Sequence, residues 1–369
     1  MKNPKISIIS TSYNHEKYIS YFIESILNQT YQNFELIIID DKSNDNNVSI
    51  AKSYKDNRIK IIEHKFNTGP SIAANDGILI SNGEYIAFIN TDDCVDKNWL
   101  KTGLEFLLKN KKYNSVCFQL EAIDENNYPI KNNDLQTTLK FKNIEYLDLV
   151  KSMFTVGNMV PSPGQIIKKS ILNNIGYINS SLFQTQDYDL HARYLLKNQI
   201  FVFQKPLIKY RQLSNGSNID NHSISSQLRF NLEMPFVLDN FLKIDIDLFN
   251  KVFKNDCKKI GKPTQKTIPY FLGIIALNTK DSVRQKWGYQ TILKFIQEKN
   301  NLKLLNSLYS IEYKNIISTI NSINSPSEEK ILNVEKIEKE LFEAKEYILK
   351  VKNSNLNKIK QKLKKYLNR

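Results

Sequence analysis

Cysteine is scarce in this chain of 369 residues, which contains only three. Cys94, Cys117 and Cys257 lie far apart and form no Cys-x-x-Cys pair, so the sequence argues against a disulfide scaffold and predicts a reduced, cytoplasmic setting. The longest fully apolar run, FLGIIAL, is far shorter than a membrane span, and the N-terminal residues lack a signal-peptide pattern. We therefore expect a protein that is soluble or bound peripherally to a membrane.

Glycine-rich phosphate loops are also missing. The chain has no G-x-G-x-x-G sequence and no Walker-type lysine motif, which argues against dinucleotide-binding and P-loop proteins. A nucleotide diphosphate could instead be held through a divalent cation, with carboxylates as the oxygen ligands.

Acidic residues are outnumbered, and the formal net charge is +14. Such a charge predicts an acidic partner, and nucleic acid, anionic lipid and phosphorylated substrates all qualify. Residues 350–369 contain eight basic side chains and no acidic one, and Leu356, Ile359 and Leu363 share one helical face there. This pattern favours an anionic membrane surface, and the lack of a recognised nucleic-acid fold argues against nucleic acid.

The first 120 residues alternate between strand and helix patterns. Runs of β-branched and aromatic residues predict strands, and apolar residues at helical spacing predict the helices between them. The expected strands are 5–11, 34–40, 58–64, 85–90 and 115–120, and the expected helices are 16–29, 46–54, 71–80 and 99–109. This order predicts an α/β fold with a mostly parallel central sheet flanked by helices.

Polar residues follow three of these strands, as Thr11-Ser12-Tyr13-Asn14, Asp40-Asp41-Lys42-Ser43 and Asn90-Thr91-Asp92-Asp93. Ligands of parallel sheets bind at the carboxyl ends of the strands, so these residues predict a binding site. The adjacent carboxylates of Asp92 and Asp93 repel each other, and they require either a cation or water beside them. A solvated turn before the helix near Trp99 is the alternative interpretation.

Three stretches together resemble a known family. SIISTSYNHEKYISYFIESILNQTYQNFELIIIDDKSND, FNTGPSIAANDGI and GEYIAFINTDD have the order and spacing of the family 2 glycosyltransferases, and the resemblance covers roughly residues 4–215. It implies a Rossmann-like GT-A fold and an inverting enzyme. It also implies a nucleotide-sugar donor, usually a UDP-sugar, and a divalent cofactor, Mn²⁺ or Mg²⁺.

The resemblance implies a set of donor-binding residues, which are Thr11, Tyr13, Asn14, Asp41, Asn75 and Asp92. The first three match a segment that touches the nucleoside, and Asp41 matches the carboxylate at the uracil end. Beside Asn75 the chain departs from the family pattern, because Ala74 replaces an arginine.

The metal site follows from the same resemblance. Asn90-Thr91-Asp92 occupies the D-x-D signature of the family, with asparagine in the first position, and Asp93 comes next. We expect Asp92 and Asp93 to hold Mn²⁺ or Mg²⁺ against the diphosphate, where a cation neutralises charge on the leaving UDP.

An inverting transfer needs a base that deprotonates the acceptor hydroxyl. TQDYDLHARYL resembles the Glu-Asp motif that begins a helix in this family, and Asp187 matches its base, while Gln186 replaces the glutamate. Helix capping is the alternative role for Asp187, and Asp189 is the rival base. We expect His191 to be a packing or surface residue.

The segment 206–219 matches the part of the family fold that closes over the diphosphate, with Leu213 in place of a histidine. Either the metal has one protein ligand fewer, or Ser217 or His222 substitutes. Arg211 could contact phosphate or lie on the surface as an ordinary strand-end arginine. Residues 160–178 are expected to form an acceptor-side wall.

We expect three parts, namely a catalytic domain over 1–224, a helical accessory region over 225–324 and a C-terminal helix over 325–369. A short heptad seam within 334–351 could pack on the preceding helices or form a homo-oligomer. The expected activity is sugar transfer to a saccharide or lipid-linked acceptor at the inner face of a bacterial membrane, in surface polysaccharide synthesis. A non-catalytic nucleotide-sugar-binding or scaffold protein with the same fold is the alternative.

Overall fold

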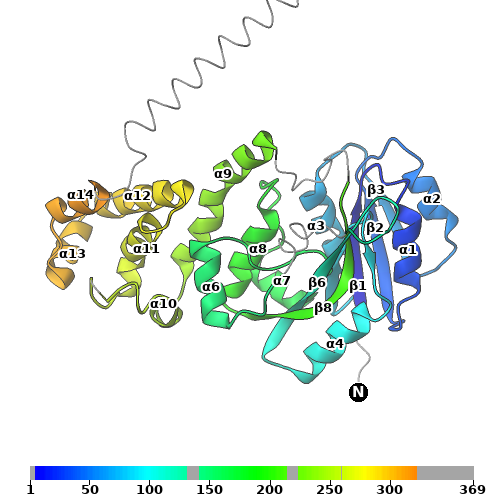
Figure 1. Ribbon diagram of the computed structural model, residues 1–369, viewed down its shortest axis with the longest axis horizontal. Coiled ribbons are helices and arrows are strands. Elements are labelled where there is room, and N and C mark those ends of the chain that lie inside the picture. The colour runs from blue at the N-terminus through cyan, green and yellow to red at the C-terminus, as the bar shows by residue number, and fades with distance from the viewer. Residues whose placement is uncertain (1–4, 131–140, 214–222, 259, 322–369) are drawn as a thin grey trace, which may run out of the picture. The chain divides into compact units, whose positions relative to one another are not determined.

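The structure is a computed structural model that describes residues 5–130, 141–213, 223–258 and 260–321 (Figure 1). The chain divides into two compact units, residues 1–310 and 311–369. In the second unit the described element is α14 (Tyr313–Asn321). All the other elements belong to the first unit.

The described residues form a sheet of eight strands in the order β3-β2-β1-β4-β7-β6-β8-β5. β1/β2, β2/β3, β1/β4 and β6/β8 are parallel pairs, whereas β4/β7, β6/β7 and β5/β8 are antiparallel. The predicted α/β fold with a mostly parallel sheet is confirmed, and the antiparallel β7 joins its two parallel parts. The strands are β1 (Ile6–Ser12), β2 (Phe34–Asp40), β3 (Ile59–Glu63), β4 (Tyr85–Phe88), β5 (Cys94–Val95), β6 (Tyr113–Ile123), β7 (Ile166–Lys168) and β8 (Gln199–Arg211).

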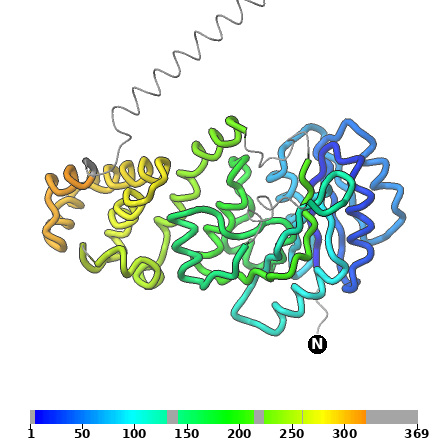
Figure 2. Tube along the Cα trace, viewed as in Figure 1, coloured from blue at the N-terminus to red at the C-terminus, as the bar shows by residue number. Residues whose placement is uncertain are grey.

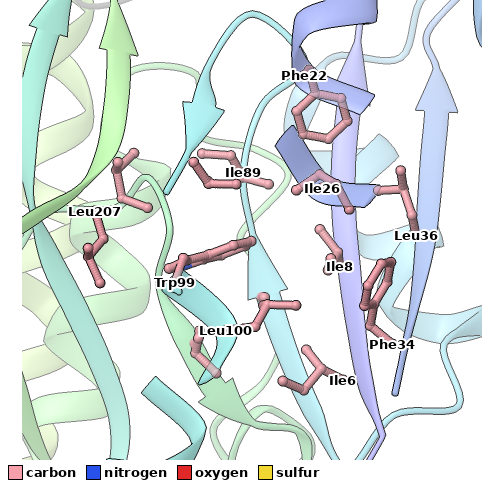
Figure 3. Packing of buried hydrophobic residues seen from close by; sticks show 14 of the residues in the cluster. Ile6, Ile8, Phe22, Ile26, Phe34, Leu36, Ile89, Trp99, Leu100 and Leu207 are labelled. Atoms are coloured by element: carbon pink, nitrogen blue, oxygen red, sulfur yellow. The ribbon is translucent and has the colours of Figure 1, made fainter. Parts of the chain in front are cut away.

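Helices cover both faces of the first half of the sheet. Side chains alternate between the two faces of a strand, so neighbouring residues of β1 face different helices. On one face, Phe22 and Ile26 of α1 (Ile19–Leu27) pack with Ile8 in the hydrophobic core (Figure 3). On the other face lies α3 (Pro70–Ile80), where a Cβ atom on Gly77 would come within 2.6 Å of Ile9 Cγ2. The two remaining helices of this half are α2 (Asn47–Ser53) and α4 (Trp99–Lys109).

The register of the two central strands brings their polar ends together. β1 and β2 pair from Ile6 opposite Phe34 to Ser12 opposite Asp40. All seven residues of β2 are buried, as expected for a strand that is covered on both faces. The loops that follow β1 and β2 therefore start side by side.

The second half of the first unit is mainly helical, which confirms the predicted helical C-terminal region. Figure 2 shows the green segments of the middle of the chain lying between the blue and cyan half and the yellow helices. α8 packs against α6 and α9, and α9 also packs against α12. The helices are α6 (Tyr146–Thr155), α7 (Lys169–Ile175), α8 (Gln186–Leu195), α9 (Ile224–Asp239), η1 (Asn240–Lys243), α10 (Ile246–Val252), η2 (Gln265–Thr267), α11 (Ile268–Leu277), α12 (Ser282–Gln297) and α13 (Asn301–Tyr309).

The expected domain boundaries stay predictions. α9 begins at the expected boundary of 224, but residues 1–310 form one compact unit. The C-terminal segment 325–369, with its heptad seam and its basic end, lies outside the described residues. Among the helices that the structure describes, none has the length and apolar character needed to cross a bilayer.

Candidate active site

The ends of β1 and β4 meet, as predicted, at the carboxyl edge of the sheet. Thr11 Oγ1 donates to Asn90 Oδ1 over 3.3 Å, and Thr91 Oγ1 donates to Ser12 Oγ over 2.7 Å. His15, which was not singled out from the sequence, places Nδ1 2.8 Å from Thr91 Oγ1. Hydroxyl groups thus fix the strand end that carries Asp92.

Asn14 ties the loop after β1 to the loop after β2. Its φ of 56° lies in the left-handed region, which asparagine tolerates better than most residues. The main-chain N of Asn14 donates to Ser43 Oγ over 2.9 Å, and its Oδ1 accepts from Asn44 N over 2.8 Å. Tyr13 beside it is 44% exposed, so this edge presents an aromatic ring to a ligand.

Asp41 is buried and anchors the loop that leads into α3. Oδ1 accepts from Thr68 N and Thr68 Oγ1, both over 2.8 Å, and from His64 Nδ1 over 2.9 Å, while Oδ2 accepts from Gly69 N over 2.7 Å. Burial alone would raise the pKa of Asp41, but the hydrogen bonds from Thr68, His64 and Gly69 outweigh it and lower the pKa. The carboxylate is therefore charged, and a nucleotide contact would add to bonds that it already makes.

The two adjacent carboxylates of the turn after β4 differ in burial. Asp93 is buried, and its Oδ1 accepts from Arg211 N over 2.9 Å. Asp92 is partly buried, and its Oδ1 lies in the interior with no hydrogen-bond partner among the described residues. Asp93 thus helps to hold the turn, and Asp92 keeps a buried carboxylate oxygen to which no described group donates.

Arg211 is fully buried, so the surface position weighed for it was wrong, while the phosphate contact stays a prediction. Its Nε donates to the main-chain O of Asp92 over 2.6 Å, and Nη1 donates to Asp124 O over 2.7 Å. Nη2 donates to Asn127 Oδ1 over 2.6 Å, and the guanidinium lies 4.6 Å from the ring centre of Tyr18. A buried charge requires such partners, and Arg211 consequently fixes the Asp92–Asp93 turn.

The donor set around Asp92 fits a divalent cation held jointly with a diphosphate. Within the described residues, no group of three or more His, Cys, Asp and Glu side chains could hold a metal ion by itself. However, Mg²⁺ in nucleotide sites is typically held by one or two carboxylates together with substrate phosphates. A buried oxygen without a donor is also unfavourable, and a cation beside Asp92 Oδ1 would relieve this cost. Ser217 and His222, the proposed substitutes for a histidine at Leu213, lie outside the described residues.

Asp187, the expected base, is the second residue of α8 and is partly exposed. Asn158 Nδ2 donates to its Oδ2 over 3.1 Å, and Tyr188 N donates to its Oδ1 over 2.7 Å. Asp189 is buried, pairs with Arg193 at 2.7 Å and accepts from Asn240 Nδ2 over 2.8 Å. Of the two rival carboxylates, Asp187 is therefore the more accessible to an acceptor.

His191 is a buried packing residue that lies beside Asn158. Its Nδ1 lies 3.3 Å from Asn158 Oδ1, and its Nε2 lies 3.2 Å from Gln165 Oε1. Burial lowers the pKa of His191 to about 3, so the imidazole is neutral at physiological pH. Both ring nitrogens face amide oxygens, so the neutral imidazole can donate a hydrogen bond to only one of the two. Asn158 was missed in the sequence, because a lone loop asparagine belongs to no motif.

Asn75 joins the donor side of the sheet to the segment that precedes α8. Its Nδ2 donates to Ile178 O over 2.8 Å, and its Oδ1 accepts from Ile178 N over 3.0 Å. Both ends of the amide are therefore engaged with one main-chain residue. A direct contact of Asn75 with the donor stays a prediction.

Comparisons with known sequences find glycosyltransferases. A family model described as Glycosyl transferase family 2 matches residues 7–176. An uncharacterized glycosyltransferase of Methanocaldococcus jannaschii is 31% identical over 217 residues, covering 57% of this chain and 72% of that protein. The Escherichia coli UDP-Glc:alpha-D-GlcNAc-diphosphoundecaprenol beta-1,3-glucosyltransferase WfgD is 32% identical over 221 residues, covering 58% of this chain and 80% of that protein.

A solved structure extends the likeness beyond the region of the family model. The crystal structure of S. aureus TarS 1–349 in complex with UDP-GlcNAc matches with a TM-score of 0.54 and 19% identity, covering 86% of this chain and 90% of that chain. At this identity the match shows the fold alone, and it confirms the GT-A fold expected from the sequence.

The buried His191 predicts a specific acid sensitivity. An unfolded histidine takes up a proton below a pH of about 6.5, whereas the folded one stays neutral down to about 3. The free energy of unfolding should therefore fall as the pH drops from 6.5, by about 2 kcal/mol at pH 5 from this residue. Urea unfolding of the wild type and of His191→Gln at pH 7.5 and pH 5 measures the contribution of His191 to this loss of stability. An equal loss in both proteins would contradict the assignment.

Proposed function

The chain belongs to glycosyltransferase family 2, and from this membership we propose that it is an inverting, metal-dependent enzyme that transfers a sugar from a UDP-sugar. The observation that carries the proposal is the pair of carboxylates at the two sides of the site. Asp92 follows β4 with a buried oxygen that has no partner among the described residues, and Asp187, the second residue of α8, has a partly exposed side chain. We assign Asp92 to the cation that binds the leaving diphosphate, and Asp187 to the deprotonation of the acceptor hydroxyl.

In the proposed reaction, the acceptor hydroxyl attacks C1 of the donor sugar from the face opposite the diphosphate. The new C1–O bond forms as the C1–O bond to the diphosphate breaks, which inverts the configuration at C1. Asp187 accepts the hydroxyl proton and later releases it to solvent. Asn158 Nδ2 and Tyr188 N, at 3.1 and 2.7 Å, hold the carboxylate for this step.

The donor would lie at the carboxyl edge of β1, β2 and β4. We assign the nucleoside to the segment of Thr11, Tyr13 and Asn14, with Asp41 at the base and Asn75 beside the sugar-diphosphate. Asp92 would hold Mn²⁺ or Mg²⁺, and Asp93 stays a predicted second ligand. The bound cation supplies electrostatic stabilisation of the leaving UDP.

The relatives guide the choice of substrates. The S. aureus structure contains UDP-GlcNAc, which supports a UDP-sugar donor. The E. coli relative is described as acting on a diphosphoundecaprenol-linked sugar, which supports a lipid-linked saccharide acceptor and a role in surface polysaccharide synthesis. This acceptor would place the enzyme at the cytoplasmic face of the membrane. We assign membrane contact to the basic residues 354–369 and possible self-association to 334–351.

Release of UDP from a panel of UDP-sugars, with water as the acceptor, tests the proposal. We expect the wild type to release UDP from at least one donor with Mn²⁺ or Mg²⁺ but not with EDTA. Asp92→Asn should weaken UDP binding in the presence of metal, because it removes the carboxylate charge, and should change it little in EDTA. The control is Asp148→Asn, which alters an exposed aspartate of α6. UDP binding without any UDP release from the panel would instead favour a non-catalytic binding protein.

The base assignment predicts a different kinetic effect. Asp187→Asn should lower donor turnover by about 100- to 10,000-fold, since the amide cannot accept the proton. UDP affinity and the melting temperature should change little. Asp189→Asn should mainly lower stability, because it breaks the buried pair with Arg193. A larger loss of turnover per folded molecule in Asp189→Asn would move the base to that residue.

A further inference from the structure

The start of α8 is held by a glutamate from the C-terminal helical region. Glu233 belongs to α9, which lies beside α8, and its side chain is largely buried (Figure 1). Its Oε1 accepts from Phe183 N over 3.0 Å, and its Oε2 accepts from Gln184 N and Thr185 N over 2.8 and 2.9 Å. Thr185 Oγ1 also donates to Oε2, over 3.0 Å. One carboxylate thus receives four hydrogen bonds from three consecutive residues.

These bonds hold the segment that leads into α8, up to its N-cap residue. The N-cap residue of a helix commonly accepts a hydrogen bond from the first turn through its own side chain. Thr185 is the N-cap of α8 but makes no such bond, because its hydroxyl points to Glu233. The carboxylate also places a negative charge beside the helix N-terminus, where it is favourable. The position of the first turn of α8 consequently depends on α9.

Two other buried side chains reach the same turn from the C-terminal region. Asn240 Nδ2 donates to Asp189 Oδ1 over 2.8 Å, and Arg284 Nη2 donates to Tyr188 OH over 3.1 Å. Arg284 Nε also donates to Phe154 O of α6 over 2.7 Å. The residues on both sides of Asp187 are therefore fixed from outside the stretch 7–176 that matches the family model.

We propose that Glu233 is a positioning residue for Asp187, and that α9 thereby contributes to the active site. This inference rests on the proposed function of Asp187 as the base. Glu233 contacts the main chain at 183–185 and not the Asp187 side chain, so it acts through the placement of the first turn. A displacement of about 1 Å at a reacting group can cost about 100-fold in rate. The donor-side residues belong to other elements, so donor binding should be unaffected.

The kinetic test combines Glu233→Ala with Asp187→Asn in a double-mutant cycle, read as release of UDP from the best donor of the panel. We expect Glu233→Ala to lower kcat by about 100-fold while the KM for the donor and the affinity for UDP stay within about twofold. Added to Asp187→Asn, it should cause little further loss, because the base is already absent. Glu105→Ala, at an exposed glutamate of α4, is the matched control.

Glu233→Gln gives a graded version of the same test. An amide has one acceptor oxygen, so it can serve either Phe183 N or the Gln184 and Thr185 donors but not both groups. Its loss of kcat should therefore lie between those of the wild type and Glu233→Ala. A loss that multiplies fully with that of Asp187→Asn would overturn the proposal, since Glu233 would then act independently of the base.

A second readout does not depend on activity. Hydrogen–deuterium exchange of the full chain should show the amides of 183–185 exchanging about fivefold faster or more in Glu233→Ala, since their hydrogen bonds to the Glu233 carboxylate are lost. Unchanged exchange in this segment would overturn the positioning role even if the enzyme were active. A wild type that releases no UDP would refute the proposed function, and the exchange result would still decide whether Glu233 fixes α8.

Discussion

The buried guanidinium of Arg211 is the constraint on which the turn after β4, the proposed donor site, depends. A cation in the interior is tolerated only when acceptors surround it, and here these come from the turn after β4, the turn after β6 and the ring of Tyr18. The turn that carries Asp92 can therefore occupy only a narrow range of positions. Because Arg211 bonds the main-chain oxygen of Asp92, it fixes the backbone that carries the proposed metal-binding carboxylate.

The segment around Asp187, the proposed acceptor site, is also held by side chains that hydrogen-bond to the main chain. Asn75 binds the main chain of Ile178 at both ends of its amide, and Glu233 binds the main chain ahead of α8. These contacts link α3 and α9 to the segment that positions Asp187. The site is thus assembled from the sheet and from the C-terminal helices together, although the family model matches only residues 7–176.

Local patterns were sufficient to predict the βα alternation of the first 110 residues, because strands such as Phe34–Asp40 are continuous buried runs. They did not identify β5 and β7, which have two and three residues and exist only through pairing with distant strands. The family resemblance pointed to Asp92 and Asp187, whose roles stay predictions. The burial of Arg211 and the roles of Asn158 and Glu233 depend on contacts between residues far apart in the chain, and no local pattern encodes them.

The most direct test is to locate Mn²⁺ by anomalous diffraction in crystals of the full chain grown with UDP. The central claim is that the turn fixed by Arg211 presents Asp92 to a cation shared with the diphosphate. It predicts a manganese peak within coordination distance of both the Asp92 carboxylate and the diphosphate oxygens. UDP bound at the carboxyl edge of the sheet with no manganese beside Asp92, or with manganese held by other residues, would contradict it.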